Sequence, residues 1–160
     1  MIGIMSDSHD NLDAVRSVVG LFKDADCRLL LHAGDFVAPF TARELEKAGC
    51  PVKAVFGNCD GEKTGLAAVI EHFGEIREGP FEFNYSGFNI LIIHSDAAVE
   101  KHLAERNHDL IIFGHTHKAE VRKRGKTLIV NPGETGGWLT GRRTAALFDP
   151  TTGKADIVAL

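Results

Sequence analysis

Five short apolar runs in this chain each lead into a segment containing Asp, His or Asn, and this pattern constrains the fold more than any other feature. The polar segments are Asp7-Ser8-His9, Gly34-Asp35, Gly57-Asn58, His94 and Gly114-His115-Thr116-His117. Short apolar runs of this kind are typical of buried strands. Strands that end at the same side of a sheet bring residues distant in sequence into one small volume. The pattern therefore predicts a polar site at a sheet edge.

The polar residues of these segments are of the types that bind metal ions. The seven candidate ligands are Asp7, His9, Asp35, Asn58, His94, His115 and His117. Mixed carboxylate, carboxamide and imidazole ligands suit Mn, Fe, Zn, Co or Ni. In an extended segment, residues two apart point the same way, so each D-x-H or H-x-H pair can reach one site or two adjacent sites. Seven ligands exceed what one tetrahedral ion accepts, so we expect two ions that share a carboxylate.

Taken singly, most of the seven have structural explanations as turn, helix-cap or hydrogen-bonded core residues. His115 and His117 carry the strongest individual signal, because two imidazoles beside a glycine have few structural reasons to occur together. The other histidines lack such a context and are interpreted as helix, surface or supporting residues: His32, His72, His102 and His108. The joint occurrence of the motifs in this order favours the metal site.

The first third of the chain has the pattern of a parallel β-α-β-α-β unit. Strands are expected at residues 2–6, 27–32 and 52–56, with helices over 12–22 and 39–47 between them. Asp10 or Asn11 would cap the first helix. Right-handed crossovers then make the three strands parallel.

The second half of the chain is rich in hairpin signals. Hairpins are expected to join residues 81–85 to 89–93, 120–123 to 127–130 and 144–148 to 155–158, with a helix over 97–105 and a strand over 110–113. Two sheets packed face to face, with helices on the outer faces, would satisfy the whole pattern. We expect residues 1–160 to form one domain.

Composition excludes several classes of partner. The net charge of −4 gives no electrostatic case for binding duplex nucleic acid. Cys27, Cys50 and Cys59 include no CxxC spacing, which argues against a disulfide framework and a thiolate zinc site. No stretch approaches the roughly 20 apolar residues that a bilayer span needs. We therefore expect a cytoplasmic protein without a membrane partner.

The motifs D-x-H, G-D, G-N-x-D, H and G-H-x-H together resemble those of the calcineurin-like metallophosphoesterase superfamily. Size and layout are similar to those of its small bacterial and archaeal phosphodiesterases, and the run Ile-Val-Asn-Pro-Gly at residues 129–133 resembles that subgroup too. The resemblance implies an α/β (α+β) fold, a four-layer αββα sandwich of two mixed β-sheets flanked by helices.

The resemblance also implies roles for individual residues. One ion would be held by Asp7, His9, Asp35 and His117, and the other by Asp35, Asn58, His94 and His115, with Asp35 bridging. Catalysis through the metals is expected of Asp7, His9, Asp35, Asn58 and His94. The ions would be Mn²⁺, with Ni²⁺, Fe²⁺, Co²⁺ or Zn²⁺ as alternatives. A hydroxide that bridges them would hydrolyse a small or nucleotide-type phosphodiester.

Two positions depart from the family pattern. Cys59 stands where phosphomonoesterase relatives have a histidine that protonates the leaving oxygen, and a neutral thiol is a poor proton donor. Asp96 replaces the second histidine of the usual H-G-H and could cap the following helix, assist His94 or repel anions. Asp60 is expected to orient the neighbouring loop or a ligand.

Alternatives to a phosphodiesterase remain open from these residues. The same fold includes a retromer scaffold subunit that binds proteins, so a catalytically weak scaffold is a second hypothesis. A phosphomonoesterase or phosphoprotein phosphatase is a third, disfavoured by Cys59. The expected partner is a small phosphodiester substrate, and a homodimer through a surface strand or hairpin is compatible with the pattern.

Overall fold

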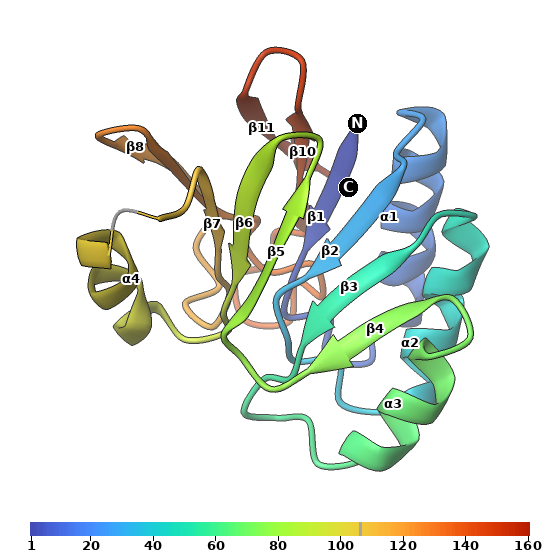
Figure 1. Ribbon diagram of the computed structural model, residues 1–160. Coiled ribbons are helices and arrows are strands. Elements are labelled where there is room, and N and C mark those ends of the chain that lie inside the picture. Colours follow the sequence, from blue (N-terminus) through green and yellow to red (C-terminus); the bar gives the residue numbers. More distant parts are fainter. Residues whose placement is uncertain (106) are drawn as a thin grey trace.

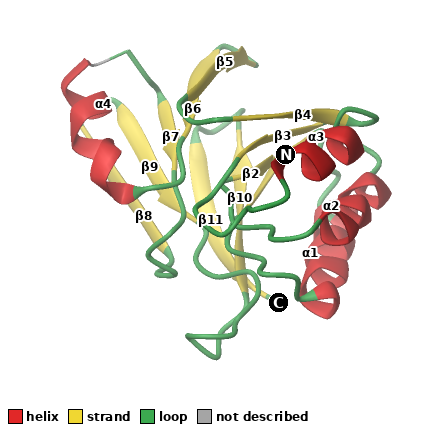
Figure 2. Cartoon of the chain, turned by 90° about the horizontal axis from the view of Figure 1, so that it is seen from below, coloured by secondary structure: helices red, strands yellow, loops and turns green. Residues whose placement is uncertain are grey.

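The computed structural model, which describes residues 1–105 and 107–160, has two β-sheets packed face to face with helices on both outer faces (Figure 1). Three helices cover one sheet: α1 (Leu12–Asp24), α2 (Pro39–Glu44) and α3 (Lys63–Ile70). On the opposite side α4 (Val99–Glu105) covers the other sheet, as Figure 2 also shows. This arrangement confirms the predicted four-layer sandwich. No helix among the described residues is both long and apolar enough to cross a membrane.

The first sheet has the strand order β11-β10-β1-β2-β3-β4. Its strands are β1 (Ile2–Met5), β2 (Leu29–His32), β3 (Val52–Val55), β4 (Gly74–Arg77), β10 (Thr144–Asp149) and β11 (Lys154–Ala159). Strands β1 to β4 are parallel, while β10 runs antiparallel to β1 and β11 antiparallel to β10. The predicted parallel unit and the third predicted hairpin therefore share one sheet.

The second sheet has the order β5-β6-β7-β9-β8. Its strands are β5 (Phe81–Tyr85), β6 (Phe88–Ile92), β7 (Leu110–Ile112), β8 (Glu120–Arg124) and β9 (Thr127–Asn131). The first two predicted hairpins, β5-β6 and β8-β9, are present, and β6, β7 and β9 are parallel.

Successive side chains along a strand point to opposite faces of the sheet, so apolar residues of the first sheet pack against both neighbouring layers. Ile2 and Ile4 of β1 lie in the cluster between the two sheets, whereas Met5 packs toward the helices. A Cβ at Gly3 would lie 2.7 Å from the ring of Phe22, so α1 approaches β1 more closely than a side chain there would allow. The parallel strands therefore have an apolar layer on each face, as buried strands of this kind do.

Several boundaries differ from the expectations. The cap of α1 agrees with one of the two predicted residues: Asn11 accepts from Ala14 N, whereas Asp10 accepts from Ala38 N and Thr41 Oγ1 at the start of α2. The predicted helix over 39–47 divides into α2 and a 3₁₀ turn, η1 (Leu45–Ala48), and the helix over 97–105 begins as another, η2 (Asp96–Ala98).

The structure adds α3 and β4, which the sequence pattern did not predict. Eight-residue α3 contains Gly65 and has no capping side chain, and edge strand β4 starts with a glycine. Both features weaken the local helix and strand signals.

Candidate metal centre

The loops that follow five parallel strands gather at one edge of the molecule, the lower edge in Figure 1, and all seven predicted ligands lie there. Asp7 and His9 follow β1, Asp35 follows β2, Asn58 follows β3, His94 follows β6, and His115 and His117 follow β7. Both sheets therefore contribute to one site, as the strand-end pattern predicted.

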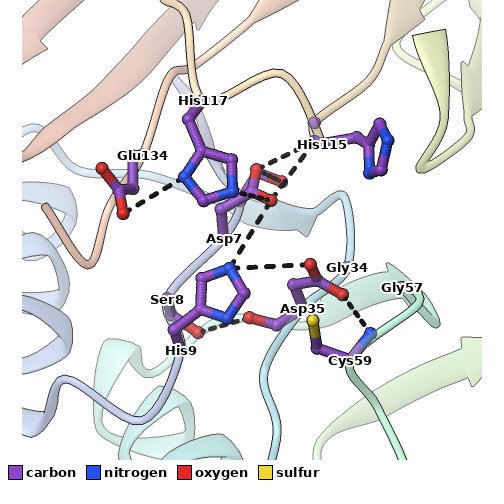
Figure 3. A network of polar contacts seen from close by, with 12 residues as sticks. Asp7, Ser8, His9, Gly34, Asp35, Gly57, Cys59, His115, His117 and Glu134 are labelled. Atoms are coloured by element: carbon purple, nitrogen blue, oxygen red, sulfur yellow. Dashed lines mark hydrogen bonds and ion pairs between the residues drawn. The ribbon is translucent and has the colours of Figure 1, made fainter. Parts of the chain in front are cut away.

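Asp35 occupies the centre of this site. Its Oδ2 lies 3.5 Å from Nε2 of His9 and 3.5 Å from Nε2 of His94. Its Oδ1 accepts a hydrogen bond from the Cys59 backbone N–H at 2.8 Å, which fixes the carboxylate plane (Figure 3). One oxygen of Asp35 thus faces an imidazole from each side.

A first group of ligand atoms comes from Asp7, His9 and His117. Their nearest donor atoms all lie within 4.8 Å of one another. Nε2 of His117 is 3.4 Å and Nε2 of His9 is 4.0 Å from Oδ1 of Asp7. Nε2 of His9 is buried and has no hydrogen-bond partner among the described residues, so its position is not explained by hydrogen bonding within the chain.

Glu134 lies behind His117, on the side away from Asp7 (Figure 3). Its Oε1 is 3.1 Å from Nδ1 of His117. Burial raises the pKa of Glu134, but hydrogen bonds from Leu139 N, Thr140 N and Thr140 Oγ1 outweigh it and lower the pKa below the usual value. This contact is an ion-pair distance without hydrogen-bond geometry, and the charge of the ionised carboxylate favours a proton on Nδ1 of His117, the ring nitrogen away from Asp7.

A second group is formed by Asn58, His94 and His115. Oδ1 of Asn58 is 2.8 Å from Nε2 of His94 and 2.9 Å from Nδ1 of His115. Nδ1 of His94 lies 2.8 Å from the Ala33 carbonyl oxygen, which can only accept, so the proton of a neutral His94 lies on Nδ1. Its Nε2 and Asn58 Oδ1 are then two acceptors facing each other.

These distances fit divalent metal ions held between the facing acceptors. Two ligand atoms each about 2.1 Å from a common ion, at angles between octahedral and tetrahedral, are separated by roughly 3.0–3.4 Å. The His117–Asp7 separation of 3.4 Å lies at the upper end of this range, and the Asp35–His94 separation of 3.5 Å lies just above it. The residues present therefore fit the binding of divalent metal ions.

The loops hold these side chains at an energetic cost. Five of the seven residues adopt positive φ angles between 41° and 67°: Asp7, His9, Asp35, His115 and His117. A non-glycine residue in the left-handed region costs of order 1–3 kcal/mol and is concentrated at functional sites. The strain indicates loops shaped for side-chain placement rather than for local stability.

Asp7 is held by its neighbours as well as by its loop. Ser6 Oγ donates to its Oδ2 at 2.6 Å, and the His115 backbone N–H donates to the same carboxylate. Burial raises the pKa of Asp7, partly offset by the Ser6 hydrogen bond and by the nearby imidazole of His117. A bound cation would favour the ionised form.

Asp60 holds the loops around Asp35, as predicted. Its carboxylate accepts from the backbone N–H groups of Gly57, Asp35 and Val37. Burial raises the pKa of Asp60 although these three donors oppose the shift. One side chain thus joins the loop after β2 to the loop after β3.

Cys59 lies beside the centre with an exposed side chain. Its Sγ lies within 4.8 Å of ligand atoms of His9 and Asp35. Desolvation and the negative charge of Asp35 raise the pKa of the Cys59 thiol, so it is neutral at physiological pH. The structure therefore puts a neutral thiol where the family relatives described above have an imidazole.

Asp96 has neither of the roles proposed for it toward its neighbours. The N-cap of η2 is Ser95, whose hydroxyl accepts from Ala97 N, and Asp96 is the first exposed residue of that turn. The described partner of His94 Nδ1 is the Ala33 carbonyl. An extended Ser95 at φ −81° and ψ 134° presents its own hydroxyl to the turn, so the capping prediction for Asp96 was wrong.

Three residues support the site; Glu134 and Asn131 were not predicted in this role, whereas a supporting role was one of those expected for His32. Glu134 orients His117; Asn131 Nδ2 donates to Gly114 O and Thr116 Oγ1, which fixes the loop after β7. Buried His32 contacts Ser8 Oγ through Nε2 and accepts from Gly34 N. The sequence signals were the run at residues 129–133, which contains Asn131, and position: Asn131 ends β9 and Glu134 follows it, at the edge where the other strands end.

Known proteins resemble the chain along nearly its whole length. A family model described as the calcineurin-like phosphoesterase superfamily domain matches residues 1–153. Phosphodiesterase MJ0936 of Methanocaldococcus jannaschii is 32% identical over 152 residues, which cover 92% of each protein. A solved archaeal phosphodiesterase superposes with a TM-score of 0.95 at 30% identity over 99% of each chain.

Vps29 of Chaetomium thermophilum also superposes, with a TM-score of 0.71 over 99% of this chain and 95% of Vps29. Its identity of 16% shows a shared fold alone. The family model and the relative at 32% identity instead match the sequence itself. The chain therefore belongs to the calcineurin-like phosphoesterase superfamily, as its motifs predicted.

Proposed function

We propose that this chain is a phosphodiesterase that uses two divalent transition-metal ions, with Mn²⁺ preferred, to hydrolyse a small or nucleotide-type phosphodiester. The names of its relatives support the reaction, since MJ0936 and the archaeal protein of similar structure are both phosphodiesterases. The metals follow from the donor set, which combines carboxylate, carboxamide and imidazole groups.

The observation that carries this proposal is the position of Asp35. A carboxylate oxygen equidistant, at 3.5 Å, from the imidazoles of His9 and His94 is the arrangement that a shared ligand of two ions requires. Asp7 and His117 complete one set of ligands with His9, and Asn58 and His115 complete the other with His94. Two bound ions would lower the pKa of water and neutralise phosphoryl charge.

Residues of the chain orient the histidine ligands and determine how the leaving group is protonated. The Ala33 carbonyl accepts from Nδ1 of His94, and the ionised carboxylate of Glu134 lies 3.1 Å from Nδ1 of His117, so Nε2 of each ring faces the site and can bind a cation. Cys59 supplies no effective acid for the leaving oxygen. Substrates whose leaving group needs little protonation are therefore favoured, which disfavours the phosphomonoesterase hypothesis.

The decisive experiment is an assay of metal-stripped protein resupplied with Mn²⁺ or Ni²⁺. Bis(p-nitrophenyl) phosphate should be hydrolysed faster than p-nitrophenyl phosphate, and not at all without metal. Asp35→Asn keeps the shape of the side chain but removes the shared charge, so it should abolish turnover while circular dichroism stays unchanged. Asp13→Asn, at an exposed residue of α1, is the matched control.

Two outcomes would contradict the proposal. Unchanged turnover in Asp35→Asn would rule out a shared carboxylate as the centre of the reaction. Failure of every metal-loaded sample to cleave any phosphate ester would favour the scaffold hypothesis, for which the low-identity likeness to Vps29 gives only weak support.

A further inference from the structure

Trp138 is an exposed indole attached to the backbone of a candidate metal ligand. It is the single tryptophan of the chain, and 63% of its surface is exposed. Its Nε1–H donates to the backbone oxygen of His9 at 3.0 Å. The polar edge of the ring is therefore satisfied by the loop after β1, while much of the apolar ring surface faces solvent.

The segment that carries Trp138 is attached to the site at several points. Thr135 N donates to Ser6 O and Gly136 N donates to Asp7 O, so the segment pairs with the loop that bears Asp7 and His9. A Cβ at Gly136 would lie 2.7 Å from Ser8 O, which shows how closely the two backbones approach. The indole is thus held beside the candidate metal centre rather than at the end of a free loop.

Two exposed large apolar side chains are adjacent in the segment beside this site. The exposed large apolar residues among those described are Met1, Phe40, Val121, Trp138 and Leu139. Trp138 and Leu139 are neighbours in this segment, whereas Phe40 is the second residue of α2. Trp138 and Leu139 therefore form an exposed apolar pair beside the loop that carries His9.

Two arginines that follow Trp138 closely in the chain, Arg142 and Arg143, offer positive charge to an anionic ligand. The side chain of Arg143 lies against Gly137, where a Cβ would be 2.7 Å from its Cγ. Neither Arg142 nor Arg143 has a carboxylate partner in the part of the chain that the structure describes. An aromatic face, free guanidinium groups and a cation-binding centre together match a nucleotide, which has a planar base and phosphate charge.

We propose that Trp138 is the base-binding platform of this enzyme, and that the substrate is a phosphodiester with a nucleobase which stacks on the indole. This inference rests on the proposed phosphodiesterase activity, because the metal centre fixes the phosphate from which the base extends. A base–aromatic stack is sequence-tolerant, since every base has a π-face. The platform therefore selects nucleotides as a class rather than one base.

Two esters with the same leaving group test the platform. Thymidine 5′-(p-nitrophenyl phosphate) and methyl p-nitrophenyl phosphate differ in the presence of a nucleoside. Trp138→Ala should raise KM for the thymidine ester by roughly 5- to 150-fold relative to the methyl ester, the effect of losing one stack. Trp138→Phe keeps a ring but loses the bond to His9, and should restore most of the preference. Val121→Ala, an exposed apolar residue of β8, is the control.

Binding provides a readout that needs no turnover. As the chain has a single tryptophan, emission at that residue reports directly on the platform. Adenosine monophosphate should quench the fluorescence of Zn²⁺-loaded protein, whereas inorganic phosphate should quench it far less. Equal quenching by the two ligands, or none by either, would overturn the inference.

The outcomes separate the platform from the proposed activity. If both esters are cleaved but Trp138→Ala changes their KM values alike, the platform is wrong and the activity stands. Quenching by adenosine monophosphate without cleavage of either ester would leave the platform and remove the proposed activity. A dimer in sedimentation that is lost in Trp138→Ala, with unchanged KM values, would assign the indole to a second copy of the chain and overturn the inference.

Discussion

Oε1 of Glu134 lies 3.1 Å from Nδ1 of His117, while Nε2 on the other side of the same ring lies 3.4 Å from Oδ1 of Asp7. The imidazole is therefore held between two carboxylates from different loops. Leu139 N–H donates to the same Oε1 of Glu134 and Thr140 N–H donates to its Oε2, so the position of His117 depends on residues that contact no candidate ion.

Glu134→Gln is expected to weaken metal binding about 10- to 100-fold, as is typical when the outer partner of a histidine ligand is lost. The amide keeps the size of the side chain but no longer stabilises a proton on Nδ1 by charge. Calorimetric titration of metal-stripped protein with Mn²⁺ measures the change. Glu62→Gln, at an exposed glutamate before α3, is the control. Equal affinities for the wild type and Glu134→Gln would contradict the role of Glu134.

The candidate ligands were predictable from sequence because each lies at a strand end. The apolar runs before Asp7, Asp35 and His94 are long enough to indicate buried strands, and parallel strands bring their ends together. The hairpins were also predictable from local sequence, because a glycine lies in or near the turn, as in Ser86-Gly87 between β5 and β6.

Other features could not be predicted from sequence, because they depend on contacts between residues that are distant in the chain. Glu134 lies in a glycine-rich segment, and only the folded chain brings it to His117. Strand β4 is short and amphipathic at an edge of the first sheet, where pairing with β3 rather than its own sequence stabilises it. The sequence pattern likewise could not distinguish Ser95 from Asp96 as the cap of η2, since both are good capping residues.

Cys59→His is expected to add the proton donor that the site lacks. Sγ of Cys59 lies near His9 and Asp35, so an imidazole at this position would reach the leaving oxygen of a substrate held there. General acid catalysis contributes about 10²–10⁴-fold in well-placed cases, so we expect a gain of at least about 10-fold for alkyl leaving groups. Hydrolysis of p-nitrophenyl esters should change little.

The test for Cys59→His is the ratio of kcat/KM for an alkyl and an aryl phosphodiester in wild type and variant. Cys59→Ser is the control, because serine also lacks an acid of suitable pKa. If the alkyl-to-aryl ratio is the same in the wild type, the histidine variant and the serine variant, the position does not reach the leaving group.

His32 should make the stability of the metal-free protein depend on pH. Burial lowers the pKa of His32 well below 6.5, and its ring packs on Phe36 with centroids 3.5 Å apart. The folded-state pKa lies below the unfolded value, so the unfolded chain binds more protons in acid. The contribution of neutral His32 is present above pH 6.5 and is lost as the pH falls below it.

His32→Asn removes this titration but keeps an oxygen that can accept from Gly34 N. Urea unfolding of both proteins at pH 7.5, 6.5 and 5.5 measures the effect. The free energy of unfolding of the wild type should fall more steeply than that of the variant below pH 6.5, by up to about 1.4 kcal/mol per pH unit. Parallel pH profiles would show that His32 is protonated in the folded state as readily as in the unfolded one.

Gly114 leaves the space that the side chains of Ser6 and Asp7 occupy. A Cβ there would overlap Ser6 Oγ and lie 2.7 Å from Asp7 Oδ2. Gly114→Ala should therefore displace the hydroxyl that donates to Asp7, lowering the free energy of unfolding by about 1–3 kcal/mol. The displaced carboxylate should also weaken metal binding, which calorimetric titration detects.

A matched substitution separates this overlap from the general effect of replacing a glycine. Gly20 lies in α1 with nothing within 4 Å of an added Cβ, so Gly20→Ala should stabilise the protein by up to about 1 kcal/mol through helix propensity. Removing the overlapping hydroxyl in Ser6→Ala/Gly114→Ala should recover part of the stability lost in Gly114→Ala. Because Ser6 Oγ is the atom closest to the added methyl group, a double variant no more stable than Gly114→Ala would assign the cost to the backbone of the loop after β7 instead.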